Sequence, residues 1–514
     1  MVIKMEVNMN KVMSLLSELS LSDEPKKHLI ELKTTLITLT APRIKELPSN
    51  LNLNVLFDSF NSSDSEQVEL TVDILTHLLP FVSPKEVVER FSEHLLRGLA
   101  HPHQKVRTLV LKEIQLCSDT DTGVMSVLSD APLLLGIVSS LGDASLGVVK
   151  VACDTLLTVC KQTDGIRAVF SSESVSTMQS VMAKSDSCRF NVYDMLVQVC
   201  LLGDLAMSTV SNSGLLDRLT AEVTTGDVLT QLNALELLTT LVVSRDGMAL
   251  LHRAGVVAKL QYLLSLAEND PMAALLMPGL IKFFGNMGHT QPRRMVEEYG
   301  SVMVMILRLA AGTLDLGDPT FQLVAMETVV HIGSSPEGIL ALAKFKTEME
   351  EVLDVIGTKM RTAPTEQRVR ILEALAQLFT VEQEDQSEEV VGTLELWWPG
   401  VAGVNLEKLM AVARQPFADL HCAALKVLKA LAYLDWGQKL IRSEPGLVEY
   451  ILNRATENES TGKVMKWDIV KTLVLSGTAP SIFDEFQMEQ LNKYYHQGVF
   501  YVETQVEVAM EGEN

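Results

Sequence analysis

A recurring helix-start signal is the feature that most constrains this chain. Turn-forming residues precede long segments with apolar side chains at three- and four-residue steps, and successive sites lie about forty to fifty residues apart. Asp accepts a hydrogen bond from the first helical turn, and Pro tolerates the first helical position because it lacks an N–H. Each site therefore predicts the start of a helix. The sites are 101–104, Gly142-Asp143, Ser185-Asp186, Gly226-Asp227, Asn269-Asp270-Pro271, Gly317-Asp318-Pro319, Ala363-Pro364 and Gln415-Pro416.

A second recurring element predicts three helices per unit. A short segment opened by glycine, a break and a medium apolar segment precede the long helix at 246–265 and 436–455, with partial copies at 164–170 and 336–345. This order and this period are typical of armadillo repeats, whereas the region around 87–117 has a two-helix HEAT pattern. No such unit buries its apolar stripe alone. We therefore expect an all-α, right-handed superhelical solenoid of armadillo/HEAT-like repeats, with the third helix of each unit on its concave face.

Composition supports one long repeat domain. Of 514 residues, 47% are hydrophobic and only 5% aromatic, which suits helices packed by mid-sized side chains. We expect a single continuous solenoid over 1–500. The acidic stretch at 381–391 breaks the period, and we expect an insertion or loop over 381–400. Trp397 and Trp398 follow the acidic stretch, and we expect at least one of them to pack against the next helix. Residues 501–514 are acidic without an apolar face, which predicts a disordered tail.

Charge and cysteine usage limit the partners and the compartment. The net charge of −22 argues against nucleic acid, because phosphate binding needs Lys and Arg. Six scattered cysteines, none in a C-x-x-C pair, predict reduced core thiols. The apolar runs are too short to span a bilayer, and the N-terminal segment has no signal-peptide pattern. We expect a monomer that contacts no membrane and lies in the cytoplasm, with the nucleus as a second compartment.

No motif for catalysis or for a cofactor is present. The sequence has no phosphate-binding loop, no G-x-S-x-G and no H-E-x-x-H. His101 with His103, and His421 with Cys422, lack two further ligands at metal spacing. We therefore predict a protein that is not an enzyme and uses no cofactor or metal, although a site assembled from distant residues would leave no motif.

Several longer segments carry a family resemblance. They are HPHQKVRTLVLKEI (101–114), LMPGLIKFFGNM (276–287), RVRILEALAQLF (368–379), QPFADLHCAALKVLKALA (415–432), PGLVEYILNRATE (445–457) and QGVFYVE (497–503). In order and spacing they resemble the proteasome non-ATPase regulatory subunit 5 family. The resemblance covers essentially the whole chain and is weakest over the first fifty residues and at 381–400.

The resemblance implies a function. That family comprises assembly chaperones of the 26S proteasome regulatory particle. A member would bind the C-terminal domain of a base ATPase, regulatory subunit 7, in an intermediate that also holds regulatory subunit 4 and a large non-ATPase subunit, and would leave before the mature proteasome forms. The alternative is an armadillo-type scaffold or transport adaptor that binds an extended peptide. Asn191, Asn233 and Asn286 lie on third helices without a matching Trp ladder, which favours a folded partner.

The candidate partner-binding residues are polar side chains on predicted third helices. Pro278 should kink its helix, and Lys282 and Asn286, one turn apart beyond it, form the preferred pair. The remaining candidates are Arg107, Lys150, Arg189, Asn191, Arg368, Arg370, His421 and Lys426.

Overall fold

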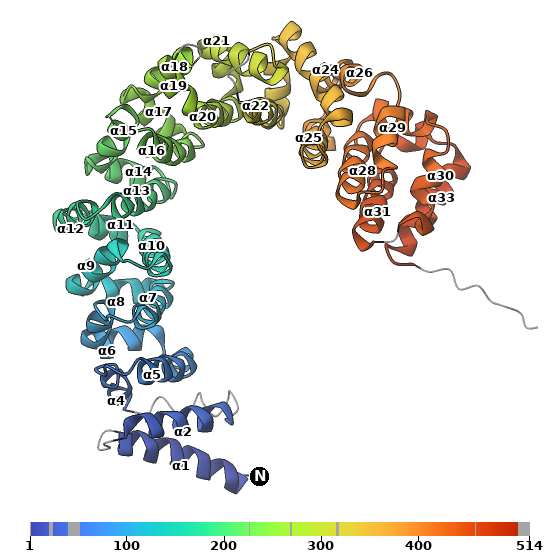
Figure 1. The fold of residues 1–514 in the computed structure, drawn as a ribbon. Coiled ribbons are helices and arrows are strands. Elements are labelled where there is room, and N and C mark those ends of the chain that lie inside the picture. Colours follow the sequence, from blue (N-terminus) through green and yellow to red (C-terminus); the bar gives the residue numbers. More distant parts are fainter. Residues whose placement is uncertain are drawn as a thin grey trace, which may run out of the picture. The chain divides into compact units, whose positions relative to one another are not determined.

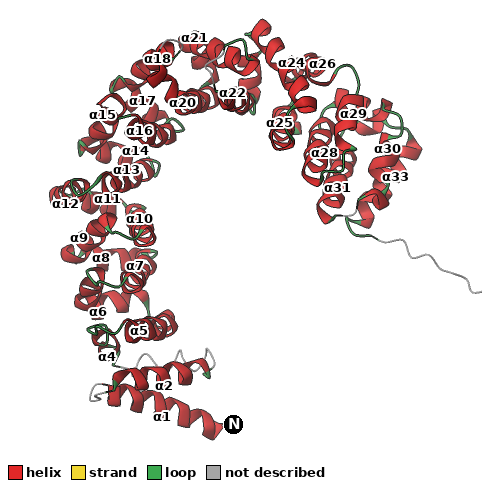
Figure 2. Cartoon of the chain, in the orientation of Figure 1, coloured by secondary structure: helices red, strands yellow, loops and turns green. Residues whose placement is uncertain are grey.

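The computed structural model is helical throughout the residues that it describes, which are 2–19, 24–39, 52–225, 227–267, 270–314, 318–457 and 459–501. Within these ranges no β-strand occurs (Figure 2). The chain divides into two compact units, Met1–Val256 and Val257–Asn514. The predicted all-α class is confirmed, while the continuity of one solenoid over 1–500 stays a prediction. The predicted tail lies outside the described residues from 502 onward.

In the first unit a helical N-terminal segment precedes a series of repeats (Figure 1). The single bent helix α6 lies between α5 and α7, with a break at Phe91, and matches the predicted two-helix unit. From α7 onward a short, a medium and a long helix alternate. The elements are α1 (Val2–Leu19), α2 (Pro25–Ile37), α4 (Asn54–Asp58), α5 (Ser65–Leu78), α6 (Pro84–Leu99), α7 (Gln104–Ser118), α8 (Asp121–Leu128), α9 (Ala131–Ser139), α10 (Leu146–Cys160), α11 (Thr163–Val169), α12 (Ser172–Met182), α13 (Asp186–Cys200), α14 (Asp204–Asn212), α15 (Leu215–Thr225), α16 (Val228–Leu241) and α17 (Arg245–Arg253), with 3-10 turns η2 (Leu79–Phe81) and η3 (Ser140–Gly142).

The second unit repeats the same arrangement. The bent helix α21, broken at Tyr299, takes the place of a short and a medium helix between α20 and α22. The elements are α18 (Val256–Leu266), which begins at the boundary, α19 (Pro271–Leu275), α20 (Met277–Thr290), α21 (Pro292–Ala311), α22 (Pro319–Ile332), α23 (Pro336–Leu342), α24 (Lys346–Thr362), α25 (Thr365–Phe379), α26 (Glu388–Ala402), α27 (Glu407–Ala413), α28 (Ala418–Ala432), α29 (Asp435–Ser443), α30 (Leu447–Leu452), α31 (Ser460–Leu475), α32 (Ala479–Ile482) and α33 (Glu485–Gln497), with 3-10 turns η4 (Gln383–Asp385) and η5 (Arg454–Thr456).

The helix-start sites act as predicted, although the capping residue differs at some of them. Asp227 and Asp318 cap α16 and α22 by accepting hydrogen bonds from Thr230 N and Thr320 N. At α13 the cap is Ser185, so Asp186 is already helical. At α10 the helix begins after Ser145, whose N–H donates to Asp143. Gly226, Asn269 and Gly317 lie outside the described residues.

Glycine marks the corner between a long helix and the next short helix. Gly338 is the third residue of α23, and a Cβ atom there would lie 1.8 Å from the carbonyl oxygen of Ile332. Because real Cβ atoms do not approach an oxygen so closely, the short helix can pack here only without a side chain. The same contact, at 1.9–2.2 Å, occurs at Gly123, Gly165, Gly247 and Gly437.

Two local expectations change. Pro278 does not kink a continuous helix: the chain turns at Leu276 between α19 and α20, and Pro278 lies in the first turn of α20, where its missing N–H breaks no helical bond. Within the stretch 381–400 only 381–387 lie outside α-helix, because α26 begins at Glu388. Trp397 and Trp398 are both buried, and Trp398 contacts the ring of Phe379 edge-on at 5.4 Å.

No single described helix is long and apolar enough to cross a membrane. The segments Asp121–Leu128 and Ala131–Gly142 together reach the required length and apolar composition, but they meet at 90°.

Candidate partner-binding face

Within each of the two compact units, the long third helices of successive repeats lie side by side in one layer, and their short and medium helices form the opposite layer (Figure 1). In the first unit this third-helix layer consists of α5, α7, α10, α13 and α16. In the second unit it consists of α20, α22, α25, α28 and α31. The residues predicted to bind a partner therefore share one layer within each unit.

A polar residue recurs at the fourth position of these helices. Arg107 in α7 is representative: its Nη1 donates to the carbonyl oxygens of His101 (2.6 Å) and Pro102 (2.8 Å), which precede its own helix. Its Nε and Nη2 donate to both carboxylate oxygens of Asp143, at 2.6 and 2.9 Å. Asp143 lies in the turn before α10, so Arg107 joins two successive repeats. The other polar residues at this position are Arg189, Gln231, Gln322, Arg368, His421 and Lys463, whereas α5, α10 and α20 have Val68, Val149 and Leu280 there.

Arg368 and His421 repeat this double contact in the second unit. Arg368, only 7% exposed, donates from Nε to Met360 O (2.9 Å) and from Nη1 to Gln415 Oε1 (3.0 Å). The ring nitrogens of His421 lie 2.6 Å from Ala413 O and 2.9 Å from Glu457 Oε2.

These contacts stabilise the stacking of repeats. Asp143, Gln415 and Glu457 were not identified from the sequence as the residues that bind these side chains. They lie 36, 47 and 36 residues after Arg107, Arg368 and His421, respectively, which is about one repeat period. That spacing was the available signal.

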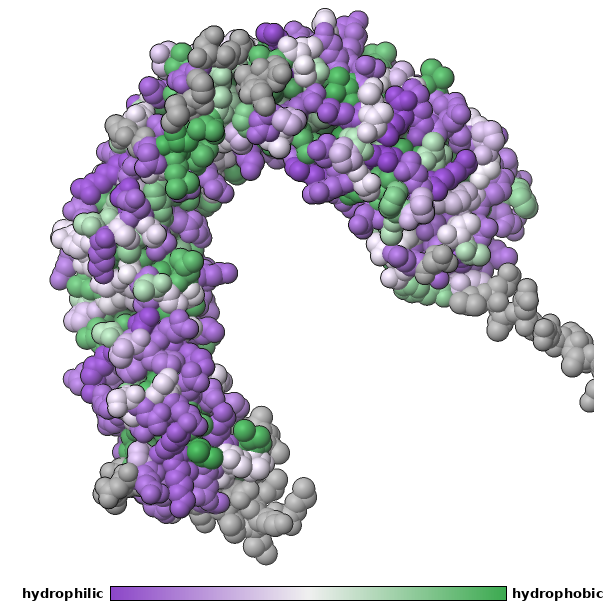
Figure 3. All heavy atoms as spheres, in the orientation of Figure 1, coloured by the Kyte–Doolittle hydropathy of each residue, from purple (hydrophilic) through white to green (hydrophobic). Residues whose placement is uncertain are grey.

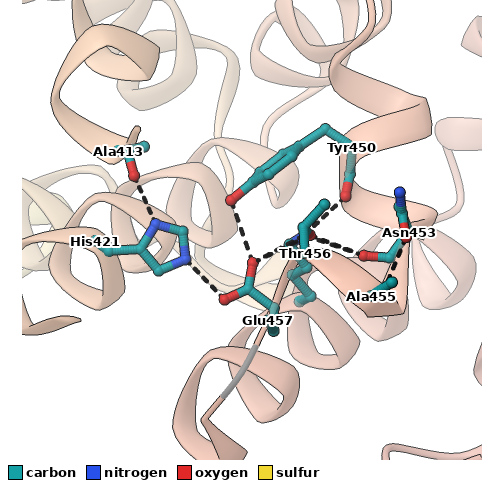
Figure 4. A network of polar contacts seen from close by, with 8 residues as sticks. Ala413, His421, Tyr450, Asn453, Ala455, Thr456 and Glu457 are labelled. Carbon is teal, nitrogen blue, oxygen red and sulfur yellow. Dashed lines mark hydrogen bonds and ion pairs between the residues drawn. The ribbon is translucent and has the colours of Figure 1, made fainter. Parts of the chain in front are cut away.

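Glu457 is the centre of a buried polar cluster in the last repeat (Figure 4). Its carboxylate lies 2.9 Å from Lys466 Nζ and accepts from the hydroxyl of Tyr450 (3.2 Å) as well as facing His421. Lys466 has no exposed surface, and its ammonium also donates to Tyr450 O (2.8 Å), to Asn453 O (3.3 Å) and to the hydroxyl of Thr456.

Burial and charge act against each other in this cluster. Burial alone would raise the pKa of Glu457, but Lys466 and His421 outweigh it, and the net pKa lies below its ordinary value of 4.5. Burial lowers the pKa of Lys466, and Glu457 opposes that shift. The pair therefore holds the turn around η5 against α31 as a hydrogen-bonded ion pair.

Other predicted residues make ion pairs between neighbouring third helices. Arg370 donates to both carboxylate oxygens of Glu327 (2.7 and 2.8 Å), and Lys426 donates to Glu373 (2.6 Å). All four side chains are at least one-third exposed, so each pair contributes little to stability.

Arg189 and Asn191, both on α13, also contact neighbouring elements. Arg189 lies 2.7 Å from Asp186 and 2.9 Å from Glu222. The Asn191 amide donates to Leu141 O at 3.1 Å.

The preferred pair separates into two different situations. Asn286 Oδ1 lies 3.0 Å from His331 Nε2, and the His331 ring stacks on His289 at 4.3 Å, so Asn286 has a structural partner. Lys282 is exposed and forms no ion pair with another described residue. Lys150 on α10 is in the same situation. Of the ten predicted residues, these two lysines are exposed cations without an ion pair to a described residue, whereas Arg368, which also has only uncharged acceptors, is buried.

Four of the six cysteines are buried, and Cys188 and Cys422 are half-buried. Burial raises the pKa of Cys153, Cys160 and Cys200 to about 12 and that of Cys117 to about 11. Their thiols therefore stay protonated and pack as small apolar groups. Among the described residues, no group of three or more His, Cys, Asp or Glu side chains could hold a metal ion.

Comparison with solved structures shows the fold. Yeast importin-beta (Kap95p) superposes with a TM-score of 0.53 at 11% identity, over 94% of this chain and 62% of that chain. Kap95 in its complex with Nup1 matches equally well, with a TM-score of 0.53 at 10% identity. These similarities agree with the predicted solenoid of helical repeats.

Comparison with sequences shows the family. The family model described as "Proteasome non-ATPase 26S subunit" matches residues 8–514. The 26S proteasome non-ATPase regulatory subunit 5 of Bos taurus is 32% identical over 98% of this chain and 99% of its own length, and that of Homo sapiens is 31% identical over the same shares. The Drosophila melanogaster protein of that name is 24% identical over 90% of each chain. This helical-repeat chain belongs to the family of the 26S proteasome non-ATPase regulatory subunit 5.

Proposed function

We propose that this protein is an assembly chaperone for the base of the 26S proteasome regulatory particle. It binds the C-terminal domain of an ATPase subunit, regulatory subunit 7, in an intermediate with regulatory subunit 4 and a large non-ATPase subunit, and it leaves before the mature particle forms. The observation that carries the proposal is the family match over residues 8–514. We further propose that it acts as a monomer in the cytoplasm and the nucleus.

Occlusion is the mechanism that suits such a molecule. A repeat protein presents extended layers of helices to a folded partner and needs no enclosed pocket for this. A chaperone that holds the C-terminal domain of one ATPase hinders its premature docking on the core particle. Excess chaperone should therefore lower the amount of complete proteasome.

Lys282 and Lys150 are the proposed contact residues, because a partner can use them without breaking a bond that holds the repeats together. An exposed lysine loses little on engaging a partner carboxylate, whereas removing Arg107 or Arg368 would first disrupt repeat stacking. These lysines are also cations in a chain of net charge −22, which makes them local attachment points for acidic residues.

The test is capture of the ATPase by the full chain carrying Lys282→Glu, compared with Lys346→Glu. Lys346 is exposed at the start of α24 in the same unit and has no ion pair with a described residue, so the two variants change the net charge equally. We expect Lys282→Glu to weaken capture by about tenfold and Lys346→Glu to leave it within about twofold. Equal capture by both variants would rule out Lys282, and failure of the unaltered chain to capture the ATPase would rule out the function.

A peptide-binding adaptor remains the second candidate. The Asn191 amide donates to Leu141 O and Asn286 Oδ1 lies 3.0 Å from His331 Nε2, so both side chains are engaged with a neighbouring repeat, whereas Asn233 on α16 is exposed. This observation supports a folded partner over an extended peptide on the third-helix layer.

A further inference from the structure

A basic pocket lies in the last described repeat, between the turn after α30, the first turn of α31 and the helix α33. Its volume is about 500 Å³. Arg454, Lys463 and Lys493 line it, and among the described residues that line it there is no Asp or Glu. Three cations without a carboxylate are unusual in a chain of net charge −22.

No anion of the described chain neutralises these cations. Lys463 and Lys493 form no ion pair with a described residue, although Glu459, the N-cap of α31, and Glu489 on α33 lie four residues before them. Arg454 is bonded only to uncharged acceptors: Nη1 donates to Gly498 O (2.7 Å) and Val499 O (3.1 Å), and Nη2 donates to Tyr494 O (3.0 Å) and Gln497 Oε1 (3.4 Å). Its charge therefore stays uncompensated at the pocket wall.

Lys466, in contrast, has an anionic partner. Lys466 lies about one turn from Lys463 on α31, is fully buried, and is paired with Glu457. The fold thus supplies a carboxylate to the lysine that stabilises the turn around η5 and supplies none to the cations that face the pocket. Charges left without a partner in a concave site raise the local concentration of anionic ligands.

The pocket is held in shape before any ligand arrives. The Arg454 guanidinium stacks 3.7 Å above the ring of Tyr494, which is 5% exposed, and its hydrogen bonds tie η5 to the end of α33. On the other side of η5, the Lys466–Glu457 pair fixes the same turn. A preorganised site loses less conformational entropy on binding.

We propose that this pocket binds an acidic peptide segment of a partner protein, with Asp or Glu carboxylates on Lys463 and Lys493 and an apolar side chain against Tyr494, Tyr501 and Leu452. The volume is in the range of sites that hold a few side chains, and its walls are partly apolar. This favours a peptide over a small inorganic anion. The proposal does not depend on which proteasomal subunit the third-helix layer binds.

The probe is a fluorescein-labelled ten-residue peptide rich in Asp and Glu with one central Tyr, and its isosteric Asn/Gln counterpart. Anisotropy titrations use the full chain, the variant Lys463→Glu/Lys493→Glu and the control Lys112→Glu/Lys408→Glu. The control makes the same charge change at exposed lysines on α7 and α27, far along the sequence from the pocket. Far-UV circular dichroism and a urea titration test whether each variant folds. If the variant Lys463→Glu/Lys493→Glu does not fold, the single variant Lys493→Glu replaces it.

We expect the acidic peptide to bind the unaltered chain about tenfold more tightly than the Asn/Gln peptide, and salt to weaken it. The affinity for the acidic peptide should fall about tenfold in the variant Lys463→Glu/Lys493→Glu and should stay within about twofold in the control variant. Equal binding of both peptides, or equal binding by both double variants, would overturn the proposal. The same titration is made with the chain that ends at residue 501. Binding that appears only with this shortened chain would assign the pocket to the glutamate-containing residues 502–514 and overturn the proposal of a partner peptide.

Discussion

Arg107 and Asp143 form a two-point ion pair between successive repeats, with Nε–Oδ2 and Nη2–Oδ1 distances of 2.6 and 2.9 Å and side chains only 13% and 10% exposed. The same guanidinium also donates to two carbonyl oxygens of the turn before α7. A planar fork with several donors fits this set, and an ammonium does not.

Arg107→Lys should therefore destabilise the first unit by about 1–3 kcal/mol, since one ammonium cannot replace the paired bonds and would leave buried acceptors unmet. Urea unfolding followed by circular dichroism measures the change. The control is Arg294→Lys, at a more exposed pair with Glu298, where we expect a change within about 0.5 kcal/mol. A loss at Arg107 no larger than at Arg294 would show that the pair does not hold the repeats together.

Gly338→Ala should be strongly destabilising, because the new Cβ would lie 1.8 Å from Ile332 O and either α23 or the end of α22 must move. We expect a loss of about 2–4 kcal/mol in the free energy of unfolding. Gly300→Ala on α21 is the matched control: nothing lies within 4 Å of its Cβ position, so the better helix former should be neutral or stabilise by up to about 1 kcal/mol. Similar effects at both glycines would refute the close-contact explanation.

Glu113 on α7 predicts a pH-dependent stability. It is 6% exposed, and burial raises its pKa from 4.5 to about 7. The folded chain therefore keeps a proton that the unfolded chain releases above 4.5, so this stabilising contribution is present below that pH and is lost as the pH rises through about 7.

Glu113→Gln removes the ionisation. The free energy of unfolding of this variant should exceed that of the unaltered chain by an amount that grows between pH 5 and pH 8, toward about 3 kcal/mol when Glu113 is fully ionised. Urea titrations at several pH values measure it, with exposed Glu236→Gln on α16 as the control. A stability difference that does not vary with pH would contradict a buried carboxyl with this pKa.

Glu457 predicts the opposite dependence. Because its pKa lies below 4.5 in the folded chain, its contribution to stability is present above that value and is lost as the pH falls through the lower, folded pKa. Glu457→Gln should destabilise the second unit at pH 7, since it leaves the ammonium of Lys466 buried without an anion. The difference in the free energy of unfolding between this variant and the unaltered chain should become smaller below pH 4.5.

The control for Glu457 is Glu373→Gln, which breaks the exposed pair with Lys426 and should change stability by less than about 0.5 kcal/mol at pH 7. Unfolding monitored by tryptophan fluorescence reports the second unit, because all four tryptophans lie in it, one of them, Trp467, beside Lys466 on α31. A stability difference between Glu457→Gln and the unaltered chain that increases as the pH falls would contradict a stabilising Glu457 carboxylate.

Much of the fold follows from local chemistry and could be predicted. Asp227 and Asp318 cap their helices because a short side-chain oxygen reaches the free N–H groups two or three residues ahead, which needs no information from elsewhere in the chain. The glycine at the third position of five short helices and the apolar stripes at helical spacing are likewise local, and they were sufficient for an all-α repeat fold. At α13 the local rule found the helix but not its cap, since Ser185 and Asp186 both suit that position.

The candidate site is different, because whether a polar side chain is free depends on residues about one repeat away. By residue type Arg368 and Lys282 are both cations on third helices, yet stacking buries Arg368 against Met360 and Gln415 and leaves Lys282 exposed. The sequence by itself determined the helices, their repeat and the family. Only the tertiary structure decided which polar residues are bound within the stack and which are available, because burial and pairing arise when neighbouring repeats come together.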